Sequence, residues 1–345
     1  EVMARSVPDL HAVDVVTDPS LHHEIVCGAL DLRLHVLVEK PMGITVGACH
    51  RMVEAAQRNN RKLSVAENYR RDPSAHLARH LLDRGAIGKP YMALFHHISG
   101  GRDIFITPWR HLKDRGGPLV DLGVHFADLI RYQLGEVDEV CGDAWLVEPV
   151  RRKPETLHSP YAFYRNRHEN MPLEVPADAE DTSVAILKMA SGATVNWVVG
   201  LGGHGNCSGE LILGTEGSLR GFGTRGGRVA LRSASGEEQN QEQILEAERE
   251  FELDPLTAHF FPKGISVGDG SVDWKLIAIE LHELAEAVLR DRPVEVDGGE
   301  GLKDVAAVYA ILEAARAGRP VKVAEVETCQ VYDYQSEIDE ALGIA

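Results

Sequence analysis

The sequence has 345 residues, of which 44% are hydrophobic and 26% are charged, as in globular proteins of about two domains. The formal net charge of −17 excludes nucleic acids and anionic membranes as main partners, because both repel an acidic surface. No segment approaches the roughly 20 apolar residues that a membrane span needs. The N-terminal residues do not resemble a signal peptide, and the five cysteines form no CxxC pair, so we expect a cytoplasmic protein.

The first 70 residues alternate short apolar runs with helical patterns. The apolar runs predict three strands, at residues 12–16, 36–38 and 63–66. Ser20 is a candidate N-cap for a helix that ends near Leu30, and Thr45 is a candidate N-cap for the next helix. Strands that alternate with helices in this way predict an α/β, Rossmann-type parallel sheet with right-handed crossovers.

The pattern changes after Asp72. A helix is predicted at residues 74–84 and is closed by Gly85. Further strands are predicted at residues 91–97, 137–146, 183–189, 194–199 and 210–213, and further helices at residues 239–252, 273–289 and 302–317. Because Ser191-Gly192 suits a hairpin turn between two of these strands, we expect an α+β domain with a large mixed or antiparallel sheet.

This pattern divides the chain into three regions, residues 1–70, 71–325 and 326–345. Residues 326–345 form a polar tail that we expect to contact a neighbouring subunit. Within the second region, residues 148–180 lack a clear period and are interpreted as a lid or a subunit arm.

Lys40 stands at the carboxyl end of a predicted strand, between Glu39 and Pro41. Ligands bind beyond the carboxyl ends of the strands in parallel sheets, and a desolvated lysine can take part in proton transfer. We expect Glu39 to hold the ammonium group. A surface lysine at a strand end is the alternative interpretation.

Residues 116–128 begin with two adjacent glycines and include Asp121, His125 and Asp128. If residues 119–134 are helical, Asp121, His125 and Asp128 lie on one face. An aspartate beside a histidine can act as an acid/base pair or as half of a metal site. It can also be a structural feature of a helix start, with the carboxylate stabilised by the helix dipole.

The segment Val38-Glu39-Lys40-Pro41 and the pattern Gly-Gly-x-x-x-Asp-x-Gly-x-His-x-x-Asp of residues 116–128 together resemble the Gfo/Idh/MocA oxidoreductase family. That family is the group of glucose–fructose oxidoreductase and inositol dehydrogenase, and the similarity runs from about Ala12 to Val323. The resemblance implies that residues 1–70 are the C-terminal portion of a dinucleotide-binding Rossmann domain, which would bind NAD or NADP. It implies that residues 71–325 are an α/β substrate and oligomerisation domain with a large open sheet. It also implies a homo-oligomer, either a dimer or a tetramer.

The resemblance further implies roles for individual residues. Lys40 would lie near the nicotinamide and the substrate, His125 would be the general acid/base, and Asp121 would assist. Residues that would contact the cofactor are Thr17, Pro19, His22, Glu39, Lys40 and Pro41. Residues that would contact the substrate are Tyr69, Arg70, Trp109 and Arg110, although Arg110 could equally be a structural ion-pair partner.

The family opens with a strand, a GxGxxG turn and a helix, and this sequence contains no such segment. The glycine cluster at residues 200–205 is followed by a strand-like run rather than a helix, so it fails the requirement for a dinucleotide loop. We expect that an N-terminal portion of the protein is omitted from the sequence. The alternative is a protein that has lost this half and with it tight NAD binding.

These observations predict reversible hydride transfer between nicotinamide and a hydroxyl or carbonyl group of a sugar, sugar derivative or cyclitol, without a required metal. Two alternatives remain open. One is an enzyme that retains NAD and cleaves glycosides, eliminates or epimerises through a keto-sugar. The other is a non-catalytic member of the family that has lost cofactor binding.

Overall fold

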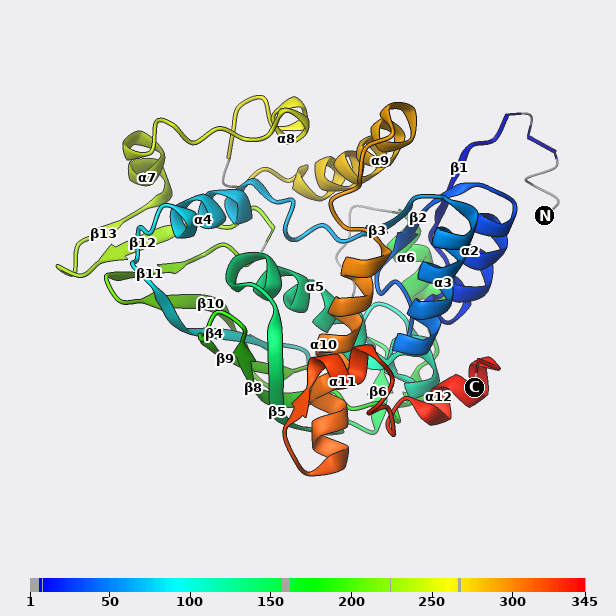
Figure 1. The fold of residues 1–345 in the computed structure, drawn as a ribbon. Helices are drawn as coiled ribbons and strands as arrows, with labels where there is room; N and C mark the ends of the chain where they lie inside the picture. Colours follow the sequence, from blue (N-terminus) through cyan, green and yellow to red (C-terminus); the bar gives the residue numbers. More distant parts are fainter. Residues whose placement is uncertain (1–5, 8, 157–161, 224, 266–267, 345) are drawn as a thin grey trace.

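The computed structural model describes residues 6–7, 9–156, 162–223, 225–265 and 268–344 (Figure 1). Its N-terminal region contains, within these residues, a sheet of three parallel strands in the order β1-β2-β3. The strands are β1 (Ala12–Val15), β2 (His35–Glu39) and β3 (Leu63–Ala66). The predicted parallel, Rossmann-type sheet is therefore confirmed.

Two helices connect these strands, and their starting points follow from short polar side chains. Thr45 caps α3 (Val46–Asn59), because its hydroxyl accepts a hydrogen bond from the amide of Ala48. The prediction that Ser20 caps the preceding helix is wrong. Asp18 is the cap, since its carboxylate accepts from the amide of Ser20 at 3.0 Å and starts the 3-10 turn η1 (Pro19–Leu21), which leads into α2 (His22–Asp31).

The second sheet is mixed and, in the described part of the chain, has nine strands in the order β13-β12-β11-β10-β4-β9-β8-β5-β14. The pair β4 and β9 is parallel, whereas the other neighbours are antiparallel. The strands are β4 (Pro90–Ile98), β5 (Val137–Trp145), β8 (Thr182–Met189), β9 (Thr194–Gly200), β10 (Cys207–Gly214), β11 (Gly217–Arg220), β12 (Ala230–Ser233), β13 (Glu238–Gln239) and β14 (Val321–Lys322). The expected large mixed sheet is confirmed.

Helices α5 (Gly117–Leu134) and α10 (Gly298–Ala317) cover the inner face of this sheet and lie between it and the first sheet (Figure 1). The two helices approach closely, because a Cβ atom on Gly123 would lie 3.0 Å from Val308. Almost every residue of α5 is buried. The polar residues of the 116–128 motif therefore lie inside the protein, where they need partners.

The remaining helices connect or cover these layers. Before the C-terminal segment, these include α4 (Pro73–Asp83), α7 (Gln241–Ala247), α8 (Pro255–Phe260) and α9 (Val272–Arg290). Helix α7 is shorter than the predicted helix at residues 239–252, since the chain leaves the helical conformation at Glu248. Helix α9 packs on the first sheet, where Leu284 contacts Leu37 and Ala66.

Residues 148–180 contain the two-stranded ribbon of β6 (Val150–Arg152) and β7 (Glu174–Pro176), and α6 (Ala162–Glu169). Part of this segment, residues 157–161, lies outside the described residues. The buried side chain of Arg151 anchors its first strand. It donates to Asp181 at 2.6 Å and to the carbonyl groups of Gly101 and Leu201.

The C-terminal residues pack against the first domain of the same chain. Helices α11 (Val323–Glu327) and α12 (Ser336–Leu342) follow the large sheet. Thr45 donates to Asp339 at 2.6 Å, and the amide of Val46 donates to Gln335 at 2.8 Å. Gln335 and Asp339 of the predicted polar tail (residues 326–345) thus secure the start of α3. Contact of this tail with a neighbouring subunit stays a prediction.

Candidate active site

Lys40 lies directly after β2 and reaches the start of α5. Its ammonium group donates to the backbone carbonyl of Asp121 at 2.7 Å and to Oδ1 of the same residue at 3.0 Å. The expectation that Glu39 holds this ammonium is wrong, because the Glu39 carboxylate accepts from the backbone amide of Lys40 at 3.1 Å instead. Lys40 is therefore fixed by α5 rather than by its chain neighbour.

Asp121 uses both carboxylate oxygens. Oδ1 accepts from Lys40, and Oδ2 accepts from the Arg110 guanidinium at 2.8 Å. Burial would raise the pKa of Asp121, but the two cations outweigh it and lower the pKa to about 2. Asp121 is thus ionised near neutral pH and orients Lys40.

Arg110 and Trp109 were predicted to contact substrate, and they form a small unit beside Asp121. The Arg110 guanidinium lies over the Trp109 ring, 4.4 Å from its centroid, and donates to Thr107 at 2.8 Å. The ion pair between Arg110 and Asp121 agrees with the alternative interpretation of Arg110 as a structural ion-pair partner. A contact with substrate stays a prediction for both residues.

His125 lies one helical turn after Asp121, but the two side chains have different partners. Nδ1 of His125 hydrogen-bonds the carboxylate of Glu67, the residue that follows β3. The ring of Tyr69 stacks on the imidazole, with ring centroids 4.3 Å apart and planes 7° apart. No partner for Nε2 is found among the described residues. The expected direct pairing of Asp121 with His125 is therefore not what the structure shows.

The charges around His125 determine its protonation. Burial lowers the pKa of His125, and the positive charges of Lys40 and Arg225 lower it further, against the opposing effect of Glu67. Burial would raise the pKa of Glu67, but His125 and Lys40 hold it below its usual range. Near neutral pH the pair is thus a carboxylate and a neutral imidazole.

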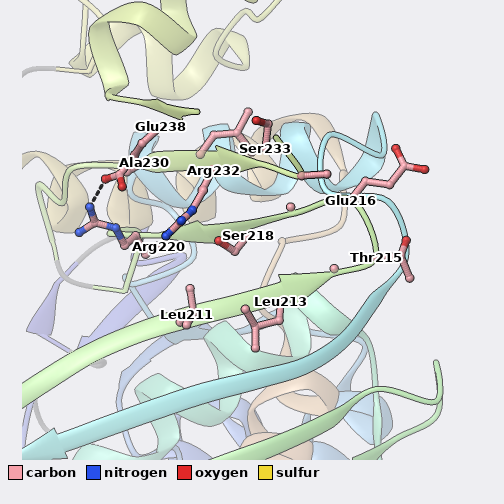
Figure 2. Close-up of a pocket in the computed structure, with 14 residues that line it drawn as sticks. Leu211, Leu213, Thr215, Glu216, Ser218, Arg220, Ala230, Arg232, Ser233 and Glu238 are labelled. Carbon is pink, nitrogen blue, oxygen red and sulfur yellow. Dashed lines mark hydrogen bonds and ion pairs between the residues drawn. The ribbon is translucent and has the colours of Figure 1, made fainter. Parts of the chain in front are cut away.

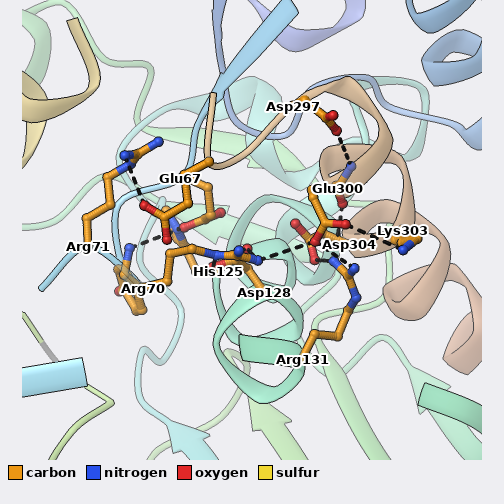
Figure 3. A network of polar contacts seen from close by, with 12 residues as sticks. Glu67, Arg70, Arg71, His125, Asp128, Arg131, Asp297, Glu300, Lys303 and Asp304 are labelled. Atoms are coloured by element: carbon orange, nitrogen blue, oxygen red, sulfur yellow. Dashed lines mark hydrogen bonds and ion pairs between the residues drawn. The ribbon is translucent and has the colours of Figure 1, made fainter. Parts of the chain in front are cut away.

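Arg70 and Asp128 form the centre of a buried ion network (Figure 3). Nε of Arg70 donates to the Asp128 carboxylate at 2.8 and 2.9 Å. Arg131, on the next turn of α5, pairs with Asp304 at 2.5 Å and with Glu300 at 2.9 Å on α10. The motif residue Asp128 thus holds Arg70, whose predicted contact with substrate stays a prediction.

His22 connects the ends of the first two strands. Its Nε2 lies 3.2 Å from the carbonyl oxygen of Thr17, and its Nδ1 lies 3.1 Å from that of Pro41. Together with the buried Pro19, these residues shape the edge at which a parallel sheet binds its ligand. The predicted cofactor residues thus lie together at this edge, and their contact with a dinucleotide stays a prediction.

Glu67 and Arg225 were not identified as site residues from the sequence. Glu67 carried a weak signal, since a carboxylate directly after an apolar strand is placed at the ligand edge. Arg225 carried no signal in the sequence, because it belongs to the loop between β11 and β12. In the structure its guanidinium lies 5.4 Å from the centroid of the Tyr69 ring. Only the packing of the second domain on the first brings it there.

A hollow of about 650 Å³ lies elsewhere, on strands β10 to β12 of the large sheet (Figure 2). Arg220 in this hollow is ion-paired with Glu238, and none of its lining residues belongs to the cluster around Lys40 and His125. In the parts of the chain that the structure describes, no three His, Cys, Asp or Glu side chains are arranged to hold a metal ion, and no helix could span a bilayer.

Comparison with known proteins supplies several relatives. The levoglucosan dehydrogenase of Pseudarthrobacter phenanthrenivorans is 31% identical over 218 residues, which cover 61% of this chain and 55% of that protein. The D-xylose 1-dehydrogenase [NADP(+)] of Haloarcula marismortui is 25% identical over 90% of this chain and 74% of its own length. The match to myo-inositol 2-dehydrogenase of Thermotoga maritima covers 39% of this chain and 40% of that protein. The chain thus spans about half the length of the first of these relatives.

The fold has solved counterparts as well. The structure of levoglucosan dehydrogenase in complex with NADH and L-sorbose superposes with a TM-score of 0.73 at 26% identity and covers 93% of this chain and 82% of that one. Residues 1–67 match a family model described as an oxidoreductase family with an NAD-binding Rossmann fold, and residues 76–220 match the GFO/IDH/MocA C-terminal domain. The chain therefore belongs to the Gfo/Idh/MocA oxidoreductase family.

Proposed function

We propose that this protein binds NAD or NADP and transfers a hydride between nicotinamide and a hydroxyl or carbonyl carbon of a sugar, a sugar derivative or a cyclitol. The observation that carries the proposal is that Lys40, at the carboxyl end of β2, is held by Asp121 one helical turn before His125, whose Nε2 has no partner among the described residues. The proposed substrate class is supported by the names of three relatives, which are dehydrogenases of levoglucosan, myo-inositol and D-xylose.

In this proposal each polar residue has one task. Nε2 of His125 accepts the hydroxyl proton when an alcohol is oxidised and returns it when a carbonyl is reduced. Lys40, held by Asp121, donates a hydrogen bond to the same substrate oxygen and stabilises negative charge on it. Nicotinamide, when bound, supplies the acceptor or donor of the hydride.

We further propose a cytoplasmic homo-oligomer. The outer face of the large sheet supports association, because Trp145, Val184 and Ile186 are each more than 40% exposed on neighbouring strands. Exposed apolar groups that adjoin one another are typical of an interface.

The test is His125→Ala in the full-length protein, assayed for NAD(P)H formation and consumption with a panel of sugars, anhydrosugars and inositols. Removal of a general acid/base is expected to lower kcat by about 10²–10⁴-fold. The control is His282→Ala, which changes a half-exposed histidine of α9 that lies outside the cluster. An unchanged kcat in His125→Ala refutes the role of His125, and product without net NADH release indicates a reaction that retains the cofactor.

A further inference from the structure

His125 is held by two groups that come from one short segment after β3. Glu67 is 1% exposed and hydrogen-bonds Nδ1 of the imidazole. Tyr69 stacks on the ring at 4.3 Å, and its own backbone amide makes a long contact of 3.5 Å with the Glu67 carboxylate. The hydrogen bond fixes the rotation of the ring, and the stack fixes its plane.

We propose that Glu67 is a positioning residue that keeps His125 in the Nδ1–H tautomer and leaves the lone pair of Nε2 for the substrate proton. This proposal rests on the proposed function and adds a residue to it. An ionised carboxylate can only accept hydrogen bonds, so the proton of the shared bond lies on Nδ1. A neutral imidazole has one N–H group, and Nε2 is therefore the basic atom.

The proton balance is simple in both directions. When an alcohol is oxidised, its O–H proton moves to Nε2 as the C–H hydride leaves to the oxidised nicotinamide, and His125 becomes an imidazolium. The negative charge of Glu67 stabilises that imidazolium, since the two groups share a buried hydrogen bond. In reduction, the imidazolium returns the proton to the substrate oxygen, and the hydride comes from the reduced nicotinamide.

The neighbouring carboxylates are not available for this role. Asp121 is occupied by Lys40 and Arg110, and Asp128 is occupied by Arg70. The charged groups that face His125 are thus Glu67 after β3, Lys40 after β2 and Arg225 from the loop between β11 and β12. Of these, Glu67 is the anion, so its removal should make protonation of the ring less favourable.

The experiment compares Glu67→Gln with the unchanged full-length protein by ¹⁵N NMR titration of His125, assigned with the His125→Ala variant, and by the pH profile of kcat. Glutamine keeps the size of the side chain but removes the charge, and its amide can offer a donor to Nδ1. A carboxylate that orients a catalytic histidine in a serine protease is worth about 10⁴-fold. We expect kcat to fall about 10²–10⁴-fold, with a smaller change in KM, and the pKa of His125 to fall.

Glu313→Gln is the matched control. Glu313 is as buried as Glu67, at 1% exposure, and lies on α10, where its carboxylate accepts hydrogen bonds from the amide of Tyr334 and the side chain of Gln335 rather than from His125. This variant should leave the titration of His125 and the pH profile unchanged, whereas Glu67→Asp, which keeps the charge, should recover part of the activity of Glu67→Gln.

The proposal is overturned if the pKa of His125 is the same in Glu67→Gln as in the unchanged protein. It is also overturned if that pKa shifts while kcat stays at the value of the unchanged protein. If Glu67→Gln does not fold, the ¹⁵N shifts of His125 in the unchanged protein still decide, because an Nε2–H tautomer contradicts the assignment. The failure of the proposed function would look different. No substrate would then be turned over, while the NMR titration would still report on the contact between Glu67 and His125.

Discussion

At the scale of single residues, the ion pairs of Lys40 and Arg110 with Asp121 define the geometry of the candidate active site. Lys40 makes two hydrogen bonds to one residue, Asp121, and Arg110 occupies the remaining carboxylate oxygen. A buried charge is tolerated only when it is paired in this way. The arrangement fixes the ammonium group, and its third N–H has no hydrogen-bond partner among the described residues, so it is available for a ligand.

Substitution of Lys40 tests this arrangement. Lys40→Met should lower kcat by about 10²–10⁴-fold, because the substrate oxygen loses a charged donor. Lys40→Arg should restore little activity, since a planar guanidinium cannot occupy the place of an ammonium group. The measurement is steady-state kinetics of both variants, with the exposed Lys89→Met as control. Full activity in Lys40→Met would contradict the role assigned to Lys40.

At the scale of elements, α10 joins the two sheets. It packs against α5 and β5 of the large domain, and its first turns reach β3 and α3 of the small one. Gly301 permits this approach, since a Cβ atom there would lie 2.7 Å from Val65 of β3 and 3.3 Å from the sulfur of Met42. The absence of a side chain at this position sets the distance between helix and strand.

Gly301→Ala is expected to destabilise the protein, and Gly28→Ala is its control. Gly28 lies in α2 and has open space where the Cβ atom would be. Both changes gain helix propensity, by at most about 1 kcal/mol, so the difference between the variants isolates the cost of overpacking, about 1–3 kcal/mol. Urea unfolding of the two variants measures this difference. Equal free energies of unfolding would show that β3 and α10 can move apart freely.

At the scale of the whole molecule, ion pairs between distant segments join the helices of the second domain. Arg131 of α5 and Lys303 of α10 both form ion pairs with Glu136, the residue directly before β5. The hydrogen bond from Arg131 and the contact with Lys303 lower the pKa of Glu136 to about 2. This pairing predicts a pH dependence of stability.

The sign follows from the direction of the shift. A carboxylate with a lowered folded-state pKa contributes stability above its unfolded pKa of about 4.3, and this stability is lost as the pH falls toward 2. Glu136→Gln should therefore be less stable than the unchanged protein at pH 7, and the difference should shrink between pH about 5 and 2. Thermal unfolding across this range checks it. A difference that stays constant with pH would exclude the ion pair as its source.

The sequence by itself determined the local structure and the position of the key motif residues. The period of apolar residues placed β1, β2 and β3 and the helix that carries Asp121 and His125, because side-chain burial repeats with the geometry of each element. The Thr45 cap was recognisable for the same local reason. Lys40 was identified because it follows a buried strand, and the family was recognisable from two motifs.

The pairing of the polar side chains was decided only by the tertiary structure. Helical spacing predicted that Asp121, His125 and Asp128 share a face, but their partners lie 81, 58 and 58 positions away in the sequence, at Lys40, Glu67 and Arg70. All three partners follow strands of the first sheet, and their side chains reach α5 of the second domain. A local pattern cannot specify such contacts, since they depend on how the two domains pack.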